Sequence, residues 1–474
     1  MLLVAISVGG PIEPCAAPRH IRRRSLTAES AFNLNEISPP EIELARAHRL
    51  AGNRALRAAF IGFFVDMFDS YLPVVALGPA MPYFQPETLS LALQSTLFYT
   101  VFALSLVGRP VGAALFGHFS DKLGRRKVTL ISMAGFAAVT FLIAMLPGYE
   151  TWGVASIVLL TFLRFVDGVF LGGEYTGANP MAMEYAPREK RGEWSAFIHS
   201  GFPLSLAAMS LLTSGLLRVI PAGSSHSAYA RWGWRIPFVL GALFACGVFL
   251  YCLRKVPESV VWAKAEKVKS PLKQLFRGEN HRVLLQSFLV MSGTWFTLNA
   301  VTSILPGVLL TVRHVNSVTV TNAQLIENLI MMFLFVPFGM LGQRIGRRTV
   351  LWLVGMAGCT VGPLLYFVLV RSGYTNTVEL IVLVTLINIC ATPAWAIITA
   401  YLNERFSTGV RASGYGISYS VATILPAFSS FYMLGLQRMG MPYEYTEVVI
   451  FALGGLLLMI GALSGPETNQ VEIC

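Results

Sequence analysis

Residues 117–126 read Gly-His-Phe-Ser-Asp-Lys-Leu-Gly-Arg-Arg, and residues 339–348 read Gly-Met-Leu-Gly-Gln-Arg-Ile-Gly-Arg-Arg. The two stretches lie 222 positions apart and share, in order, a glycine, a basic residue, an aliphatic residue, a second glycine and two arginines. Each stretch directly follows a long apolar run. Similarity at a fixed offset indicates that the chain contains an internal repeat.

A second match occurs at almost the same offset. Glu184 and Arg191 recur 220 positions later as Glu404 and Arg411. Two matches at nearly one offset predict two related halves joined by the polar, basic stretch 254–283. Paired six-helix halves with a central site are an architecture of secondary transporters.

Long apolar runs explain the composition of the chain. Of its 474 residues, 54% are hydrophobic and only 13% are charged, about half the charged share of a soluble domain. A soluble protein of this size could not cover so much apolar surface, whereas a membrane-spanning helix needs roughly 20 apolar residues. The predicted fold class is an all-α membrane protein with twelve transmembrane helices in two six-helix halves related by a pseudo-twofold axis. The predicted spans are 57–80, 93–117, 127–147, 153–178, 194–219, 235–253, 284–306, 323–343, 350–370, 378–401, 413–435 and 447–464.

The positions of the basic residues predict how these spans are oriented. With both chain ends inside the cell, 28 of the 36 Lys and Arg residues fall in cytoplasmic segments and 6 fall outside. Cytoplasmic loops of membrane proteins carry this excess, so the net charge of +11 reflects topology, and no nucleic-acid partner is expected. We expect a multi-pass protein of the plasma membrane with cytoplasmic termini. Its predicted divisions are a mostly disordered tail (1–55), an N-terminal bundle (56–253), a cytoplasmic linker (254–283), a C-terminal bundle (284–464) and a short tail (465–474).

Several motifs together resemble one transporter family. The stretch 117–126, with its altered copy at 339–348, is similar to the loop motif of the major facilitator superfamily. Residues 62–69 (Gly-Phe-Phe-Val-Asp-Met-Phe-Asp), 172–178 (Gly-Gly-Glu-Tyr-Thr-Gly-Ala) and 232–238 (Trp-Gly-Trp-Arg-Ile-Pro-Phe) narrow this resemblance. They resemble the metabolite:proton symporter family, whose members carry proline and betaine, 2-oxoglutarate, citrate or shikimate.

The resemblance covers roughly residues 60–430, and the chain departs from the family pattern at four positions within it. Asp66 replaces a usual Glu, Met67 a usual Trp and Gln343 the Asp of the second loop motif, while Asp167 stands where Gln is common. The aromatic-acid:proton symporters, which also place two acids in the first span, are a neighbouring family that the sequence leaves open.

Two carboxylates in the first span are candidates for proton coupling. Ionisable residues within a span are costly in hydrocarbon, so they are functional hypotheses by default. Asp66 lies about 14 Å into the span, and Asp69 is about 60° from it around the helix. Two close carboxylates in a low dielectric do not readily ionise together, so this pair could exchange a proton or contact a substrate cation. The alternative is a purely structural pairing with a neighbouring helix.

The fourth span carries Arg164, Asp167 and Glu174 on one stripe about 80° wide. Arg164 and Asp167 are three positions apart and could simply neutralise each other. Alternatively, a substrate carboxylate competes for the planar guanidinium of Arg164 while Asp167 accepts a proton. Glycines permit close approach of a neighbouring helix; the fourth span carries Gly168, Gly172, Gly173 and Gly177, and the second span carries Gly108, Gly112 and Gly117.

Further polar residues are candidates for a central cavity. By the resemblance, Arg109 in the second span is a candidate for an anionic group of the substrate; a link to the loop motif or to the first-span acids is the alternative. His199 in the fifth span can titrate near neutral pH or act as a hydrogen-bonded packing residue. Glu327, near the outer end of the eighth span, is a candidate for lining the cavity, with simple solvation as the alternative. The other candidate lining residues are Asn299, Asn328, Asn388 and Trp395.

The loop motifs have a different expected role. The resemblance implies that Asp121, Arg125, Glu184 and Arg191 form a cytoplasmic charge latch that favours the outward-open state, with Glu404 and Arg411 as a reduced counterpart. Asp121 is also expected to meet the N-terminus of a helix from the other half, in the eleventh span. Breaking the latch should change rates more than specificity. The full set of gating positions is Gly117, Asp121, Gly124, Arg125, Arg126, Glu184, Arg191, Gly346, Arg347, Glu404 and Arg411.

These features predict a secondary active transporter that moves a small polar metabolite, an organic acid or a zwitterion, by proton symport with alternating access. The alternatives are a uniporter or antiporter of a related solute, such as an aromatic acid or a sugar, and a non-transporting sensor on the same fold. No enzymatic activity is expected, because the sequence shows no catalytic or metal-ligating constellation and no phosphate-binding loop. The expected partners are the small-molecule substrate, protons and the lipid bilayer. The proton gradient takes the place of any cofactor, and a monomer is expected.

Overall fold

The computed structural model describes residues 39–86, 88–89, 91–222, 224–265, 268–372 and 376–473. These residues form helices and connecting turns without a strand, and twelve helical segments among them are long and apolar enough to cross a membrane. The predicted fold class is therefore confirmed. Most of the predicted disordered tail lies outside the described residues, but its last part, from Pro39, is already helical and continues into the first span.

The N-terminal half contains six spans. In chain order its helices are α1 (Pro39–Leu72), η2 (Pro73–Leu77), η3 (Gly78–Phe84), α2 (Leu91–Leu123), α3 (Arg125–Ala144), α4 (Tyr149–Trp152), α5 (Val154–Tyr185), η4 (Arg188–Lys190), α6 (Arg191–His199), α7 (Gly201–Val219), η5 (Tyr229–Gly233) and α8 (Arg235–Lys255). A linker with the short helices α9 (Val260–Lys264) and α10 (Pro271–Leu275) leads to the second half.

The C-terminal half repeats this plan with more interruptions. Its helices are α11 (Gly278–Asn299), η6 (Ala300–Ile304), α12 (Leu305–Thr311), α13 (Ser317–Ile345), α14 (Arg347–Cys359), α15 (Val361–Ser372), α16 (Thr377–Ala391), α17 (Trp395–Arg405), η7 (Thr408–Val410), α18 (Arg411–Val421), α19 (Ile424–Ala427), α20 (Ser429–Arg438) and α21 (Tyr443–Leu463). Proline lacks an N–H and clashes with the preceding turn, so helices break close to it. Several breaks within spans lie beside prolines, at Pro203, Pro306, Pro363, Pro393 and Pro426.

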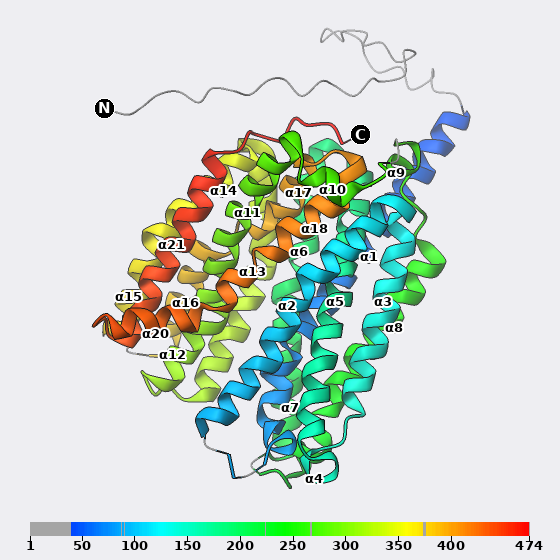
Figure 1. Ribbon diagram of the computed structural model, residues 1–474. Coiled ribbons are helices and arrows are strands. Elements are labelled where there is room, and N and C mark those ends of the chain that lie inside the picture. Colours follow the sequence, from blue (N-terminus) through cyan, green and yellow to red (C-terminus); the bar gives the residue numbers. More distant parts are fainter. Residues whose placement is uncertain are drawn as a thin grey trace.

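The two bundles lie side by side and diverge toward one end (Figure 1). The end at which they lie close together carries residues 121–127, the start of α1, the short helices α9 and α10, and the last residues of the chain; we call it the motif end. The halves meet where α2 and α5 contact α18, where α6 and α7 contact α13, and where α6 contacts α17. Buried polar contacts cross this interface, since the Asn179 amide donates to the Tyr415 hydroxyl (2.8 Å) and Tyr175 bonds Ser420.

Glycines let α2 and α5 pack with their backbones in contact; the sequence predicted close helix approach at these glycines but not which helices would meet. A Cβ atom built on Gly112 would lie 1.9 Å from the carbonyl oxygen of Val169, and one built on Gly168 would lie 2.0 Å from that of Ser105. Neither backbone atom can move aside without separating the two helices. This contact matters because Arg109 and Arg164, discussed below, extend from these same two helices.

We therefore expect Gly112→Ala to destabilise the protein, whereas Gly215→Ala, with no heavy atom within 4 Å of the added Cβ, should be neutral. Overpacking costs about 1–3 kcal/mol, which for a chain of 474 residues corresponds to a Tm lower by about 1–3 °C. Thermal unfolding of the two variants in one detergent measures the difference. Equal Tm values would show that α2 and α5 are not in backbone contact.

Candidate functional site

The first span is joined to the second by a buried ion pair. Arg109 on α2 donates from Nη2 to Oδ1 of Asp66 on α1 (2.9 Å), and neither side chain is more than 2% exposed. Arg109 also donates to the Ser70 hydroxyl, which in turn donates to the backbone oxygen of Asp66 (2.6 Å). Of the roles considered for Arg109, the structure therefore shows the link to a first-span acid.

A second arginine lies between two carboxylates. Arg164 on α5 donates from Nη1 to Oδ2 of Asp69 (2.9 Å) and to Oδ2 of Asp167 (2.9 Å), and all three side chains are fully buried. The Thr140 hydroxyl on α3 lies 3.1 Å from Oδ1 of Asp69 and 3.5 Å from Oδ1 of Asp167. One cation thus serves two carboxylates.

This arrangement differs from the expected one, in which Asp66 and Asp69 act as a pair on one helix face. The structure divides them between two arginines and brings Asp69 together with Asp167, from α1 and α5. The reason is that long arginine side chains from neighbouring helices reach the two aspartates separately. Helical geometry within one span does not reveal such partners.

Glu174 adds a fourth buried carboxyl, about two helical turns along α5 from Asp167. Neither of its oxygens has a hydrogen-bond partner among the described residues, and the side chain is 2% exposed. It packs against α1, where a Cβ on Gly62 would lie 2.2 Å from its Oε1. Away from the motif end, the spans of the N-terminal half therefore bury these four carboxyls with two arginines, Arg109 and Arg164. An unpaired charge in such surroundings is very costly.

Between the two halves lies a small aromatic pocket of about 10 Å³, roughly the space of one water probe. Three polar atoms of its lining side chains have no partner among the described residues: Nε2 of His199, Nε1 of Trp395 and the hydroxyl of Tyr419. The ring centroids of Trp395 and Tyr419 are 5.7 Å apart, and those of His199 and Trp395 are also 5.7 Å apart. The pocket lining is Phe63, Met67, His199, Phe202, Trp295, Leu298, Phe335, Trp395 and Tyr419.

The three candidate asparagines are not part of this lining. Asn299 donates to the Pro426 carbonyl (3.1 Å) and the Ser429 hydroxyl (3.0 Å), so it ties α11 to α19 and α20. Asn388 accepts from the Thr392 hydroxyl (2.7 Å), beside the break between α16 and α17. Asn328 donates to the Gln324 carbonyl (2.8 Å), within its own helix.

Buried acids also occur in the C-terminal half. The alternative that Glu327 is solvated is wrong, since its side chain is 4% exposed and accepts from the Asn328 amide (3.2 Å). The face of α13 that carries Glu327 is covered by its neighbours, which hydropathy alone does not reveal. Glu447 on α21, which the sequence analysis did not identify, is fully buried and has no partner for either oxygen among the described residues.

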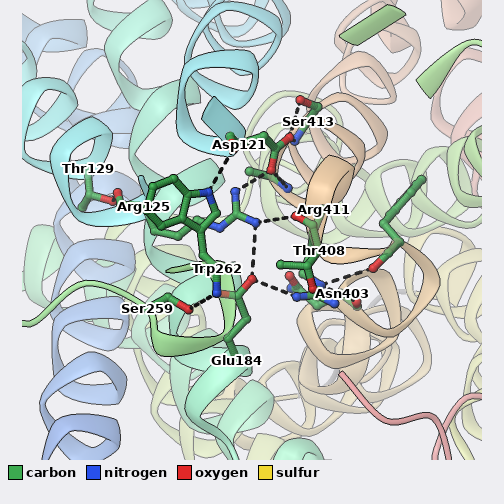
Figure 2. Close-up of polar contacts among 12 residues, drawn as sticks. Asp121, Arg125, Thr129, Glu184, Ser259, Trp262, Asn403, Thr408, Arg411 and Ser413 are labelled. Atoms are coloured by element: carbon green, nitrogen blue, oxygen red, sulfur yellow. Dashed lines mark hydrogen bonds and ion pairs between the residues drawn. The ribbon is translucent and has the colours of Figure 1, made fainter. Parts of the chain in front are cut away.

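At the motif end, Asp121 holds the N-terminus of α18 from the other half (Figure 2). It accepts from the backbone N–H groups of Ala412 (3.1 Å) and Ser413 (3.0 Å) and from the Ser413 hydroxyl (2.6 Å). A carboxylate at this position satisfies free N–H groups and complements the helix dipole. Arg125 donates to Asp121 (2.5 Å) and to the Thr408 carbonyl (2.9 Å). This is the contact with the eleventh span that the sequence predicted.

Glu184 extends the same cluster. It accepts from Arg411 (2.8 Å) and Arg125 (3.3 Å) and from the Ser259 hydroxyl. Two arginines, one from each half, thus share one buried glutamate, and Asp121 balances the charge. The cluster of Asp121, Arg125, Glu184 and Arg411 is called the gate cluster below.

The grouping of Arg191 with Glu184 is corrected by the structure. Arg191 lies 3.7 Å from Glu404 of the other half and donates to the Val471 carbonyl (2.6 Å), whereas Glu184 is paired with Arg411. The two glutamate–arginine motifs therefore exchange partners across the halves. The reason is that each arginine begins a helix, α6 or α18, whose first turn packs against the opposite bundle.

The second loop motif keeps most of the contacts that the first loop motif makes. Oε1 of Gln343 accepts from the N–H of Gly192 on α6 (3.1 Å) and from Arg347 (2.8 Å), as Asp121 does in the first half. Arg347 also pairs with Glu404 (3.3 Å). An amide replaces a carboxylate, so the pseudo-twofold position keeps its shape and loses its charge.

Sequence reasoning missed a contribution from the linker. Residues 257–259 read Pro-Glu-Ser, and they lie against the start of α3. The carboxylate of Glu258 accepts from the N–H of Arg126 (3.1 Å), and Ser259 bonds Glu184. The linker is therefore attached to the gate cluster.

The C-terminal segment likewise contacts the second loop motif and Glu404 in the second half. Residues 466–468 read Pro-Glu-Thr. Glu467 accepts from the N–H of Arg347 (2.7 Å), and the Thr468 hydroxyl donates to Glu404 (2.7 Å). The similarity of the two tripeptides is a feature of the sequence that could have indicated these contacts. Their offset, however, differs from that of the loop motifs.

Three predicted gating glycines have a steric role. A Cβ on Gly117 would lie 2.9 Å from the Cα atom of Ser413 in the other half, so any side chain there would push the bundles apart. Gly124 (φ 116°) and Gly346 (φ 103°) adopt a backbone conformation that favours glycine. Both turns place helix N-termini, those of α3 and α14, against the linker and C-terminal glutamates.

Comparisons with known proteins agree with this architecture. The model of the Major Facilitator Superfamily matches residues 59–430. The inner membrane metabolite transport protein YhjE of Escherichia coli (strain K12) is 29% identical over 432 residues, which cover 88% of this chain and 95% of that protein. The alpha-ketoglutarate permease of the same organism is 30% identical over 391 residues, which cover 82% and 88%.

Among solved structures, the proton:xylose symporter XylE bound to 6-bromo-6-deoxy-D-glucose has a TM-score of 0.70 at 16% identity, covering 89% of this chain and 97% of that one. This likeness shows a common fold. The family match spans both halves, and the relatives by sequence are transport proteins. The chain therefore belongs to the major facilitator superfamily and is a multi-pass membrane transporter, not an enzyme.

Proposed function

We propose that the chain is a proton symporter of a small organic acid or zwitterion, which works by alternating access in the plasma membrane with both termini in the cytoplasm. The observation on which the proposal depends is Arg164 shared by Asp69 and Asp167. One cation neutralises one of the two carboxylates, and the other needs a proton in these buried surroundings. Relatives named for metabolite and alpha-ketoglutarate transport favour this substrate class.

Arg164 also has free donors for a carboxylate. Its Nη2 and Nε atoms have no partner among the described residues, and a guanidinium binds carboxylates through two parallel hydrogen bonds. In the proposed cycle, a proton on the Asp69–Asp167 pair frees part of the positive charge of Arg164. A substrate carboxylate then experiences that charge, so proton and substrate binding favour each other.

The aromatic pocket, which side chains of both halves line, is proposed to bind the substrate. Its unpartnered atoms on His199, Trp395 and Tyr419 offer hydrogen bonds, and its rings offer apolar contact, a combination typical of small-molecule sites. The pocket has no room for a solute in this closed arrangement. Binding therefore requires the halves to rock apart.

The gate cluster is proposed to act as the latch that holds the motif end closed, which leaves the opposite, outer end to admit substrate. All of its contacts between halves would break when the motif end opens. The sites for coupling, substrate and gating each consist of side chains of a single chain, so we propose that it acts as a monomer.

The test is transport in proteoliposomes that contain the full chain. Labelled organic acids, betaines and amino acids are offered in counterflow and under an inside-alkaline pH gradient. We expect one of them to accumulate, and a protonophore to abolish the accumulation. Exchange without accumulation would show a uniporter, and accumulation driven only by an opposing solute would show an antiporter.

A further inference from the structure

A cleft of about 470 Å³ opens at the motif end, away from the aromatic pocket and the gap between the halves. Its walls are α1 at Arg54, the turn between α2 and α3, the end of α8 and the linker that follows it. Figure 1 shows α9, which continues this linker, beside the start of α1. The lining residues are Arg54, Leu123, Arg126, Lys127, Leu253, Arg254, Lys255, Val256, Pro257, Glu258 and Trp262.

The cleft is strongly basic. Five of its lining residues are Arg or Lys, against the single carboxylate of Glu258. That carboxylate already accepts from the N–H groups of Arg126 and Ser259. In the described part of the chain, none of the five basic side chains forms an ion pair with an acid. The cleft thus gathers cationic groups whose charge is not neutralised by the protein.

One wall of the cleft is continuous with the surface that faces lipid. Leu123 is 51% exposed and Leu253 is 44% exposed, and both line the cleft. Below them along α3 and α8, which pack against each other, Ile131 and Leu250 also point outward. Trp262, an aromatic residue of the kind enriched at the headgroup level, closes the opposite side.

We propose that this cleft binds the phosphate headgroup of an anionic phospholipid, whose acyl chains lie on the apolar face of α3 and α8. Basic pockets between the ends of transmembrane helices suit such headgroups, and arginine binds phosphate through charge-assisted hydrogen bonds. The apolar wall favours a lipid over a free phosphate, because a free phosphate has no apolar group that could contact Leu123 and Leu253.

A bound headgroup would also hold the linker in place. The indole N–H of Trp262 donates to the carbonyl of Asp121 (2.9 Å), and Ser259 bonds Glu184. The lipid site thus lies next to the gate cluster without sharing its charged side chains. Occupancy of the site stabilises the linker against the closed motif end.

The test measures phosphatidylglycerol bound to the purified full chain in detergent by native mass spectrometry. The variant Arg54→Gln/Arg254→Gln/Lys255→Gln removes three exposed charges of the cleft. The matched control Lys273→Gln/Arg277→Gln/Arg282→Gln removes three exposed charges at the same end, outside the cleft. Each basic residue near an anionic membrane surface contributes about a fivefold factor in affinity, so the cleft variant should bind about 100-fold more weakly while the control is unchanged.

Three outcomes would overturn the proposal. Equal losses in the two variants would mean that phosphatidylglycerol follows surface charge and not the cleft. Binding of phosphatidylcholine as strong as that of phosphatidylglycerol would remove the requirement for an anionic headgroup. Displacement of phosphatidylglycerol by an equal concentration of glycerol 3-phosphate would identify a site for soluble phosphates. Should the triple variant be unstable, Arg254→Gln alone should weaken binding about fivefold.

Discussion

Asp167→Asn is expected to abolish the accumulation of substrate under a pH gradient while exchange of the same substrate continues. Asparagine keeps the size of the side chain and can still bond Asp69 and Arg164. It leaves one cation paired with one carboxylate, a balanced set that has no need of a proton. The carrier should then reorient without a proton, and the gradient should no longer drive it.

For one proton per substrate, a gradient of one pH unit supports about a tenfold concentration ratio. We expect this ratio to fall to one in the variant, while the rate of counterflow stays within about threefold. Both quantities are read from the same proteoliposomes. The hypothesis of proton coupling through the Asp69–Asp167 pair is wrong if Asp167→Asn accumulates substrate as the parent protein does.

Glu174→Gln is the matched control for this experiment. Glu174 is also buried but forms no ion pair and no hydrogen bond among the described residues, so it is expected to stay protonated throughout the cycle. A glutamine imitates that neutral form, and accumulation should persist. Loss of accumulation in Glu174→Gln alone would move the coupling site from the Asp69–Asp167 pair to Glu174.

Asp121→Asn is expected to open the motif end. The carboxylate accepts three hydrogen bonds from the first turn of α18 and pairs with Arg125. An amide presents its own N–H group to some of those donors, and Arg125 loses one of its two carboxylate partners, the other being Glu184. Breaking a buried pair costs about 3 kcal/mol or more, enough to change the ratio of closed to open forms more than a hundredfold.

Spin labels at Glu189 and Arg344 measure this change, in a background without native cysteines. The two positions are exposed and lie on η4 and α13, which are in contact across the halves at the motif end. We expect their separation to increase in Asp121→Asn, and the transport rate to fall at least tenfold with little change in the order of preferred substrates. An unchanged separation would show that the gate cluster does not hold the motif end closed.

Gln343→Leu is the matched change at the pseudo-twofold position. It removes one hydrogen bond to Gly192 between the halves and one to Arg347, without removing a charge. Neutral hydrogen bonds contribute about 0.5–1.5 kcal/mol each, so its effect should be clearly smaller than that of Asp121→Asn. Equal effects would mean that shape at these positions matters more than charge.

The sequence by itself was sufficient to predict the fold. The number of spans depends on the lengths of apolar runs, and the division into halves depends on motifs repeated along the chain. Both are local properties of the sequence, which explains why the twelve spans were predicted. The meeting of Asp121 with the eleventh span was expected because an anion complements a helix N-terminus. The steric role of Gly112 and Gly168 likewise follows from residue type and helical spacing.

The partners of the buried charges were decided only by the tertiary structure. Asp69 is three positions from Asp66 but is joined through Arg164 to Asp167, almost a hundred positions away. Arg191 is seven positions from Glu184 but is paired with Glu404. Helical periodicity places a side chain on a face of its own helix. The packing of α1, α2 and α3 against α5, and of one bundle against the other, determines which side chains that face meets.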